Sequence, residues 1–169
     1  MQLLVIRHAI AEDSEAWVAA GKDDAERPLT AEGRRRMRRG ARGLQRSVPR
    51  IPLIACSPLM RARETAAILN TAYDGLPAGE ETPVLLPSAR LTDFIPWLVE
   101  HESLELVAVV GHEPHLSTLA SWLLTGRTQQ IMELKKGAAC MLSFEERLES
   151  GAAILRWSMT PGQLRRLSE

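Results

Sequence analysis

The stretch Leu3-Leu4-Val5-Ile6-Arg7-His8 is an apolar run that stops abruptly at an arginine and a histidine. Consecutive apolar residues without polar alternation are typical of a strand that is buried on both faces of a sheet. The stretches from Leu53 to Cys56 and from Leu104 to Val110 have the same character. These three runs therefore predict the central strands of one sheet.

Helical patterns lie between the apolar runs. Thr30 suits the N-cap of a helix that runs to about Gln45, and Pro58 suits the start of a second helix. Two further helices are expected over residues 94–101 and 115–124. Strands that alternate with helices indicate the α/β class, and we expect a three-layer α/β/α sandwich with a mostly parallel central sheet.

The rest of the chain predicts weaker elements. Residues 74–83 have the composition of a loop, and residues 84–86 form a weak strand candidate. Two late strands are expected over residues 138–144 and 152–158, joined by a turn. With 169 residues and no linker-like segment, the chain is expected to form a single domain over residues 1–169.

The charge balance excludes a general affinity for polyanions. The chain carries 21 Lys and Arg against 21 Asp and Glu, so its formal net charge is zero. The arginine-rich stretch 34–39 shares a helix with Met37, Ala41 and Leu44, which places its arginines on a solvated face. We therefore expect neither a nucleic-acid partner nor a membrane partner.

The cysteines and the apolar runs bear on the cellular compartment. Cys56 and Cys140 lie inside apolar runs, which is typical of buried, reduced thiols. No apolar run approaches the roughly 18 residues that a membrane span requires. Met1 is not followed by a basic region and a long apolar stretch, as in a secretory signal. We expect a cytoplasmic protein and a monomer.

Polar residues follow each of the three apolar runs. Arg7 and His8 end the first run, Arg61 follows the second, and Gly111 and His112 end the third. Because the carboxyl ends of parallel strands meet at one edge of a sheet, we expect two imidazoles and two guanidiniums to converge there. The planar fork of arginine matches the oxygens of a phosphoryl group. The pattern therefore predicts a site for a dianionic phosphoryl ligand.

The same four side chains can carry out phosphoryl transfer. A neutral His8 can attack phosphorus through one ring nitrogen. Arg7, Arg61 and a protonated His112 would neutralise charge on the phosphoryl oxygens as the transition state forms. We expect this chemistry to need neither a metal ion nor another cofactor.

Three motifs occur in order along the chain: LVIRHA at residues 4–9, SPLMRARETA at residues 57–66 and VGHEP at residues 110–114. In this order they resemble the histidine phosphatase superfamily. The segments RPLT at residues 27–30 and LKKGA at residues 134–138 are similar to those of SixA-type phosphohistidine phosphatases. The resemblance extends over nearly the whole chain.

The resemblance implies a role for each of the four residues. By that likeness His8 is the nucleophile and forms a phosphohistidine intermediate, Arg7 and Arg61 bind the phosphoryl group, and His112 hydrogen-bonds to it. Ser57 also matches a motif, but we expect it to cap the helix that starts at Pro58. Arg27 could line the entrance of the pocket or be a simple surface arginine.

The chain departs from the larger members of the superfamily in ways that bear on the substrate. It carries Ala9-Ile10-Ala11-Glu12 where the mutases carry Gly-Glu-Ser, and it lacks their long insertions. This implies a shallow, open pocket that suits a phosphorylated protein. A general acid is unassigned among Glu12, Asp93 and Glu113. Phosphohistidine relaxes the need for an acid because its leaving imidazole has a pKa near ~6.5. A small-molecule phosphomonoesterase is the alternative.

Three other classes of site are open to test. In a cysteine phosphatase an arginine stands six positions after the nucleophile, but six positions after Cys56 the residue is Ala62. A zinc hydrolase is suggested by the segment 112–115, HEPH, together with His8 and His101, but the segment is one residue short of His-Glu-x-x-His. A phosphoryl-binding module without turnover would not require the nucleophile His8.

Overall fold

A single mixed sheet forms the centre of the computed structural model, which describes residues 1–73 and 79–169. In these residues the sheet has six strands in the order β3-β2-β4-β1-β5-β6. The pairs β3·β2, β2·β4 and β4·β1 are parallel, whereas β1·β5 and β5·β6 are antiparallel. The strands are β1 Gln2–Arg7, β2 Leu53–Cys56, β3 Glu80–Glu81, β4 Leu106–Gly111, β5 Ala139–Ser143 and β6 Ile154–Met159.

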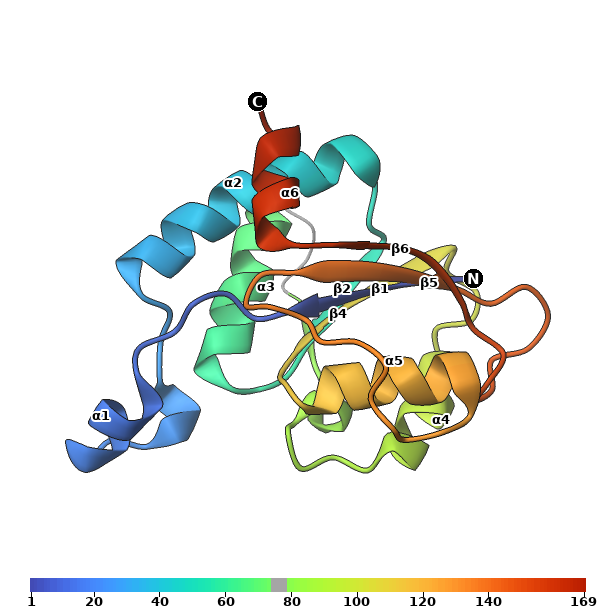
Figure 1. The fold of residues 1–169 in the computed structure, drawn as a ribbon, viewed down its shortest axis with the longest axis horizontal. Coiled ribbons are helices and arrows are strands. Elements are labelled where there is room, and N and C mark those ends of the chain that lie inside the picture. The colour runs from blue at the N-terminus through green and yellow to red at the C-terminus, as the bar shows by residue number, and fades with distance from the viewer. Residues whose placement is uncertain (74–78) are drawn as a thin grey trace.

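Helices cover both faces of the sheet (Figure 1), which confirms the predicted three-layer α/β/α sandwich. Helices α2, α3 and α6 lie on one face, and α4 and α5 lie on the other. The α-helices are α1 Ser14–Ala19, α2 Ala31–Ser47, α3 Met60–Ala72, α4 Phe94–Val99, α5 His115–Thr125 and α6 Pro161–Leu167. The single-turn 3₁₀ helices are η1 Asp24–Glu26, η2 Pro83–Leu85 and η3 Leu91–Asp93.

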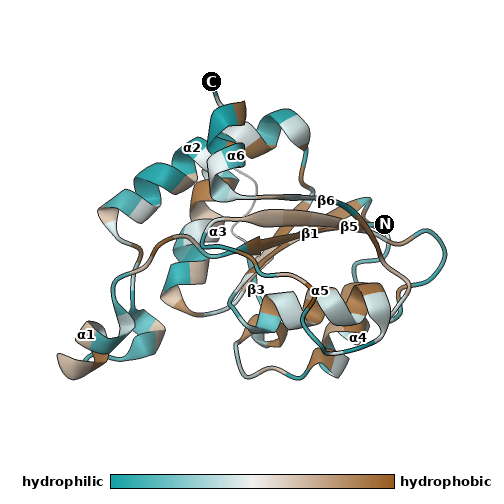
Figure 2. Ribbon diagram, in the orientation of Figure 1, coloured by the Kyte–Doolittle hydropathy of each residue, from teal (hydrophilic) through white to brown (hydrophobic). Residues whose placement is uncertain are grey.

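Strand β1 divides the hydrophobic core into two halves. Successive side chains of a strand point to opposite faces, so Leu4 and Ile6 pack toward α2 and α3, while Leu3 and Val5 pack toward α4 and α5. All four are at most 1% exposed. Figure 2 shows β1 in brown and α2 largely in teal and white. Burial on both faces accounts for the continuous apolar run in the sequence.

Helix α2 begins and packs as its sequence predicts. The Oγ1 of Thr30 accepts a hydrogen bond from the Gly33 N–H at 2.9 Å, which caps the first turn. The apolar stripe of α2 is buried, and the arginines between residues 34 and 39 are exposed or half-buried. A Cβ on Gly43 would lie 1.8 Å from the carbonyl oxygen of Leu164. Glycine at this position therefore permits the close approach of α6 to α2.

Two local predictions are wrong. Residues 84–86 do not form a strand, because Pro83 opens the 3₁₀ turn η2 and has no N–H to donate to a sheet ladder. The edge strand is instead β3, which falls inside the expected loop and pairs with Ala55 and Cys56. Residues 74–78 of that expected loop lie outside the described residues.

Helix α3 starts later than predicted. Its N-cap is Leu59, whose backbone is extended, so the helix begins at Met60 and not at Pro58. The Oγ of Ser57 accepts a hydrogen bond from the Leu59 N–H at 3.3 Å. Ser57 therefore stabilises the turn before the helix and does not occupy the cap position.

An excursion of the chain over residues 12–28 leaves the sheet edge and returns to it. A bridge between Ala11 and Leu29 closes its base, and the Glu12 N–H donates to the Pro28 carbonyl at 2.9 Å. The excursion carries α1 and η1 and extends to one side of the sandwich (Figure 1). In the described part of the chain, no helix is long and apolar enough to cross a membrane.

Candidate active site

The carboxyl ends of β1, β2 and β4 meet at one edge of the sheet. Arg7 lies opposite Gly111 in the parallel register of β1 and β4. The His8 N–H donates to the Gly111 carbonyl at 3.0 Å, and the Ser57 N–H donates to the Val110 carbonyl at 2.9 Å. The three polar strand ends noted in the sequence are therefore neighbours.

His8 is buried and held in one tautomer. Its Nδ1 lies 2.7 Å from the Ala9 carbonyl oxygen, and because a carbonyl only accepts, Nδ1 carries the proton. The Nε2 of the neutral ring then holds a lone pair. Burial, together with the charges of Arg61 and Arg7, lowers the pKa of His8 to about 3. The neutral, nucleophilic form of His8 is thus present at physiological pH.

His112 stacks at an angle beside His8, with ring centroids 5.1 Å apart. Both of its ring nitrogens are buried and have no hydrogen-bond partner among the described residues. Burial and the neighbouring His8 and Arg61 lower the pKa of His112 to about 2. The protonated His112 expected from the sequence is not found, because desolvation keeps this ring neutral in the protein without substrate. A neutral ring still donates one N–H to a phosphoryl oxygen.

Arg61 lies in the first turn of α3 and reaches the excursion. It is 5% exposed, and its Nη1 donates to the Asp24 carbonyl oxygen at 2.9 Å. Its Nη2 lies 3.1 Å from Asp24 Oδ2. Its Nε is buried without a partner among the described residues. One edge of the guanidinium is therefore fixed by Asp24, and Nε retains an unused donor.

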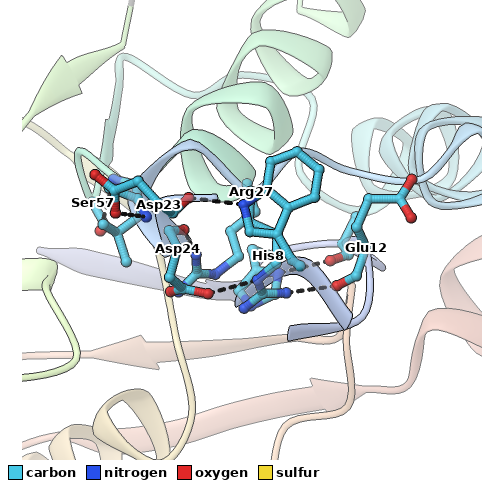
Figure 3. Close-up of polar contacts among 11 residues, drawn as sticks. His8, Glu12, Asp23, Asp24, Arg27 and Ser57 are labelled. Atoms are coloured by element: carbon cyan, nitrogen blue, oxygen red, sulfur yellow. Dashed lines mark hydrogen bonds and ion pairs between the residues drawn. The ribbon is translucent and has the colours of Figure 1, made fainter. Parts of the chain in front are cut away.

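Arg27 is a buried arginine that is linked to Arg61 through Asp24. Its Nε donates to Asp24 Oδ1 at 2.7 Å, and its Nη1 donates to the Glu12 carbonyl at 2.8 Å (Figure 3). Burial acts to raise the pKa of Asp24, but the hydrogen bond from Arg27 and the charge of Arg61 hold it below its usual range. Asp24 is thus an ionised carboxylate that joins two arginines.

Arg7 lies at the end of β1 beside the 134–137 segment. Its Nη1 donates to the Leu134 carbonyl at 2.7 Å, while its Nε is buried without a partner among the described residues. The Gly137 N–H lies 3.2 Å from the carbonyl oxygens of both Arg7 and His8. Arg7 Nε, Arg61 Nε and one ring N–H of His112 are therefore buried donors without a partner among the described residues, and an oxyanion would accept hydrogen bonds from them.

The three candidate acids lie in different places. Glu113 directly follows His112, and burial raises its pKa although Oε1 accepts a hydrogen bond from the Ser117 hydroxyl at 2.8 Å. Asp93 pairs with Arg90 at 3.0 Å on η3. The side chain of Glu12 is exposed and points away from His8 (Figure 3). Of the three, Glu113 is the one that adjoins a site histidine in the chain, and burial shifts its pKa in the direction that favours the protonated form.

The competing chemistries find little support in the described residues. Cys56 is a free, buried thiol, and burial raises its pKa to about 11, so it is not a thiolate at neutral pH. His101 lies elsewhere, 3.0 Å from Glu80 Oε2. Within residues 1–73 and 79–169, no group of three His, Cys, Asp or Glu side chains is arranged to hold a metal ion.

Sequence comparison relates this chain to the histidine phosphatases. Residues 3–83 match the model of the histidine phosphatase superfamily (branch 1). An uncharacterized protein of Picosynechococcus sp. is 36% identical over 138 residues, which cover 80% of this chain and 81% of the relative. The phosphohistidine phosphatase SixA of Escherichia coli K12 is 26% identical over 167 residues, which cover 98% of this chain and 97% of SixA.

Solved structures agree with the sequence matches. The protein histidine phosphatase SixA in complex with tungstate superposes with a TM-score of 0.81 at 25% identity, over 97% of this chain and 99% of that one. The alpha-ribazole phosphatase of Shigella flexneri has the same fold, with a TM-score of 0.74 at 20% identity over 95% and 97% of the two chains. The chain therefore belongs to the histidine phosphatase superfamily, and over nearly its whole length it is similar to SixA.

Proposed function

We propose that this phosphatase removes the phosphoryl group from phosphohistidine in a protein, through a covalent intermediate on His8, and that residues 1–169 act as one catalytic domain. The observation that carries the proposal is the state of His8. It is neutral, its tautomer is set by Ala9, and it lies beside His112 and two arginines. SixA of Escherichia coli, which is named a phosphohistidine phosphatase, is similar over nearly its whole length.

The first chemical step transfers the phosphoryl group to the enzyme. The lone pair on His8 Nε2 forms a bond to phosphorus as the bond between phosphorus and the substrate's ring nitrogen breaks. The substrate ring is protonated at its other nitrogen, so it takes that electron pair and leaves as a neutral imidazole. The N–H groups of Arg7, Arg61 and His112 stabilise the charge that spreads over the phosphoryl oxygens.

The second step returns the enzyme to its starting state. Water attacks phosphorus, the bond to Nε2 breaks, and inorganic phosphate leaves while the proton from water passes to solvent or to phosphate. The hydrogen bond from His8 Nδ1 to the Ala9 carbonyl holds the ring in the same tautomer through both displacements.

A phosphoramidate substrate depends less than a phosphate ester on a carboxylic acid that protonates the leaving group. Phosphohistidine that is protonated at its other ring nitrogen releases a neutral imidazole, the conjugate base of an imidazolium with a pKa of about 6.5, whereas an alkoxide leaves poorly without a proton. The pKa of Asp24, which contacts Arg61, is held low, so this carboxylate is a poor acid. The alternative, a small phosphate ester, is favoured by one observation: Glu113 follows His112, and burial raises its pKa.

The test compares two substrates on the intact protein. We expect kcat/KM for a phosphohistidine protein to exceed that for an aryl phosphate by roughly tenfold or more, with chelator present throughout. Glu113→Gln should leave phosphohistidine turnover within about threefold of wild type. A ratio near or below one, with ester turnover that collapses in Glu113→Gln, would establish the phosphomonoesterase instead.

A further inference from the structure

A cationic cavity adjoins the phosphoryl site at Arg7, which is among the residues that line it. Its volume is about 330 Å³, and it opens between the end of β1, helix α2 and the start of α6. Its lining includes Arg7 and Ala9, the two neighbours of His8 in the chain. The cationic residues that line it are Arg7, Arg36, Lys135, Lys136 and Arg165.

A second hollow continues the first along α2. It has a volume of about 230 Å³, and it shares Arg36 and Arg165 with the first cavity. Arg35 and Arg39 add two more guanidiniums to its lining. We call the combined surface the basic track, and define it by Arg35, Arg36, Arg39, Lys135, Lys136 and Arg165.

The basic track concentrates positive charge in a chain whose net charge is zero. Its carboxylates in the described residues are Glu32, which pairs with Arg35 and Arg36, and Glu169, which pairs with Arg39 at 3.0 Å. Six cationic side chains thus face two carboxylates. The side chains of Arg35, Arg36 and Arg39 are 66%, 49% and 43% exposed, so a partner can reach them.

The track acts on the reaction centre through its inner end. Lys136 lies close enough to His8 that its charge contributes to the low pKa of that ring. From there the track continues along α2 from residue 36 to residue 39 and includes Arg165 on α6. A phosphoryl group bound at His8 would therefore have the cationic side chains of the basic track on one side.

We propose that the basic track docks an acidic surface of the phosphoprotein substrate, next to its phosphohistidine. This inference rests on the proposed function. Carboxylates of a partner can replace Glu32 at little cost, because exposed ion pairs contribute little to stability. They would raise the encounter rate and lower KM by charge complementarity.

Two features of the track favour a protein over other polyanions. Among the described residues that line the two hollows, none is an aromatic side chain on which a base could stack. The side chains of Arg35, Arg36 and Arg39, which line the hollows, are 43% to 66% exposed, whereas a site that binds a small ligand tightly buries most of it. A folded acidic face can contact such a surface over its full length.

The experiment uses the whole protein and three phosphohistidine substrates. Two peptides of equal length carry one phosphohistidine, flanked by glutamates in one and glutamines in the other, and free phosphohistidine is the third. We expect wild-type kcat/KM to be roughly tenfold higher for the glutamate peptide, through KM, and the difference to shrink as salt is raised. The double variant Arg36→Gln, Arg165→Gln should lose this preference and keep its activity on free phosphohistidine.

A matched control comes from the same helix. Arg38 and Arg42 lie on α2 but line a different groove, against α3. Arg38→Gln, Arg42→Gln removes the same charge and should keep the peptide preference. Equal kcat/KM for the two peptides in wild type, or equal loss of preference in both double variants, would overturn the docking proposal while phosphohistidine turnover stands.

Two further outcomes also decide the matter. If none of the three substrates is turned over, the proposed function fails, and the docking proposal fails with it. The second outcome is that a single-stranded oligonucleotide or tripolyphosphate inhibits the enzyme more strongly than the unphosphorylated glutamate peptide does, and that Arg36→Gln, Arg165→Gln abolishes this inhibition. That result would assign the track to nucleic acid or to a small polyanion and overturn the proposal.

Discussion

Replacing Arg61 with alanine should reduce kcat/KM by roughly 10²- to 10³-fold, the cost of losing one preorganised donor to the developing charge. The guanidinium is 5% exposed and has a free Nε beside His112, whose pKa its charge lowers. A unit charge about 4 Å from a phosphoryl group contributes about 4 kcal/mol at an effective dielectric constant of about 20. A loss of 10²- to 10³-fold corresponds to about 3 to 4 kcal/mol, and kcat/KM reflects the whole loss because it compares the transition state with free enzyme and free substrate.

The control for this variant lies two residues further along α3. Arg63 pairs with Glu81 at 3.0 Å, and its side chain is 45% exposed. Arg63→Ala removes the same charge from the same helix and should change kcat/KM by less than about threefold. Both variants are compared on an aryl phosphate and on phosphohistidine, and the thermal midpoint of each is recorded to show that it is folded.

Asp24 provides a second test of the role of Arg61. In Arg61→Ala the carboxylate of Asp24 keeps Arg27 as a partner but no longer faces Arg61, so its charge opposes binding of a dianion. Adding Asp24→Asn should therefore recover roughly threefold to tenfold of the lost kcat/KM. A folded Arg61→Ala that loses less than about tenfold, or a loss of the same size in Arg63→Ala, would refute the assignment of Arg61 to the phosphoryl group.

Other predictions follow from the same geometry. His8→Ala should abolish turnover, measured as release of inorganic phosphate, whereas Cys56→Ser should leave it largely intact because the pKa of that buried thiol is about 11; the opposite pattern would indicate a thiol mechanism. Glu113→Gln should reduce hydrolysis of an alkyl phosphate by roughly tenfold or more and change phosphohistidine hydrolysis little, and an equal effect on both would remove Glu113 as an acid. Stability should fall in acid: the pKa values of His8 and His112, ordinarily 6.5, are lowered to about 3 and about 2, so below pH 6.5 the unfolded chain binds more protons and the free energy of unfolding decreases. Urea midpoints at pH 7 and pH 4 measure this decrease, and it should be smaller in the double variant His8→Gln, His112→Gln; an equal decrease in that variant would place the acid sensitivity elsewhere.

The central sheet and the helices around it could be predicted from local patterns. Strand β1 is buried on both faces, so its side chains form an unbroken apolar run, and the cap at Thr30 follows from one hydroxyl and its neighbours. Strand β3 could not be predicted, because Glu80 and Glu81 are joined to the sheet by backbone hydrogen bonds that leave no apolar pattern.

The site residues that can be predicted from the sequence are those that stand at the ends of strands. Arg7, His8 and His112 stand at strand ends, and parallel pairing brings strand ends together. The role of Asp24 cannot be predicted from the sequence, because its contact with Arg61 joins residues far apart in sequence and forms only when the excursion folds back. Its local signal is the Asp-x-x-Arg spacing to Arg27. The neutral state of His112 depends on desolvation, which exists in the folded protein alone.

The pairing of β1 has a consequence for how the protein is made. Gln2 pairs with Leu106 on one side and with Ser143 on the other, so the first strand of the sheet has no neighbour until most of the chain has been synthesised. Long-range pairing of this kind slows folding and leaves an apolar segment exposed in the nascent chain. We expect the nascent strand to need shielding from aggregation at the ribosome. His8, at the end of that strand, would then acquire its surroundings late, after β4 has joined the sheet.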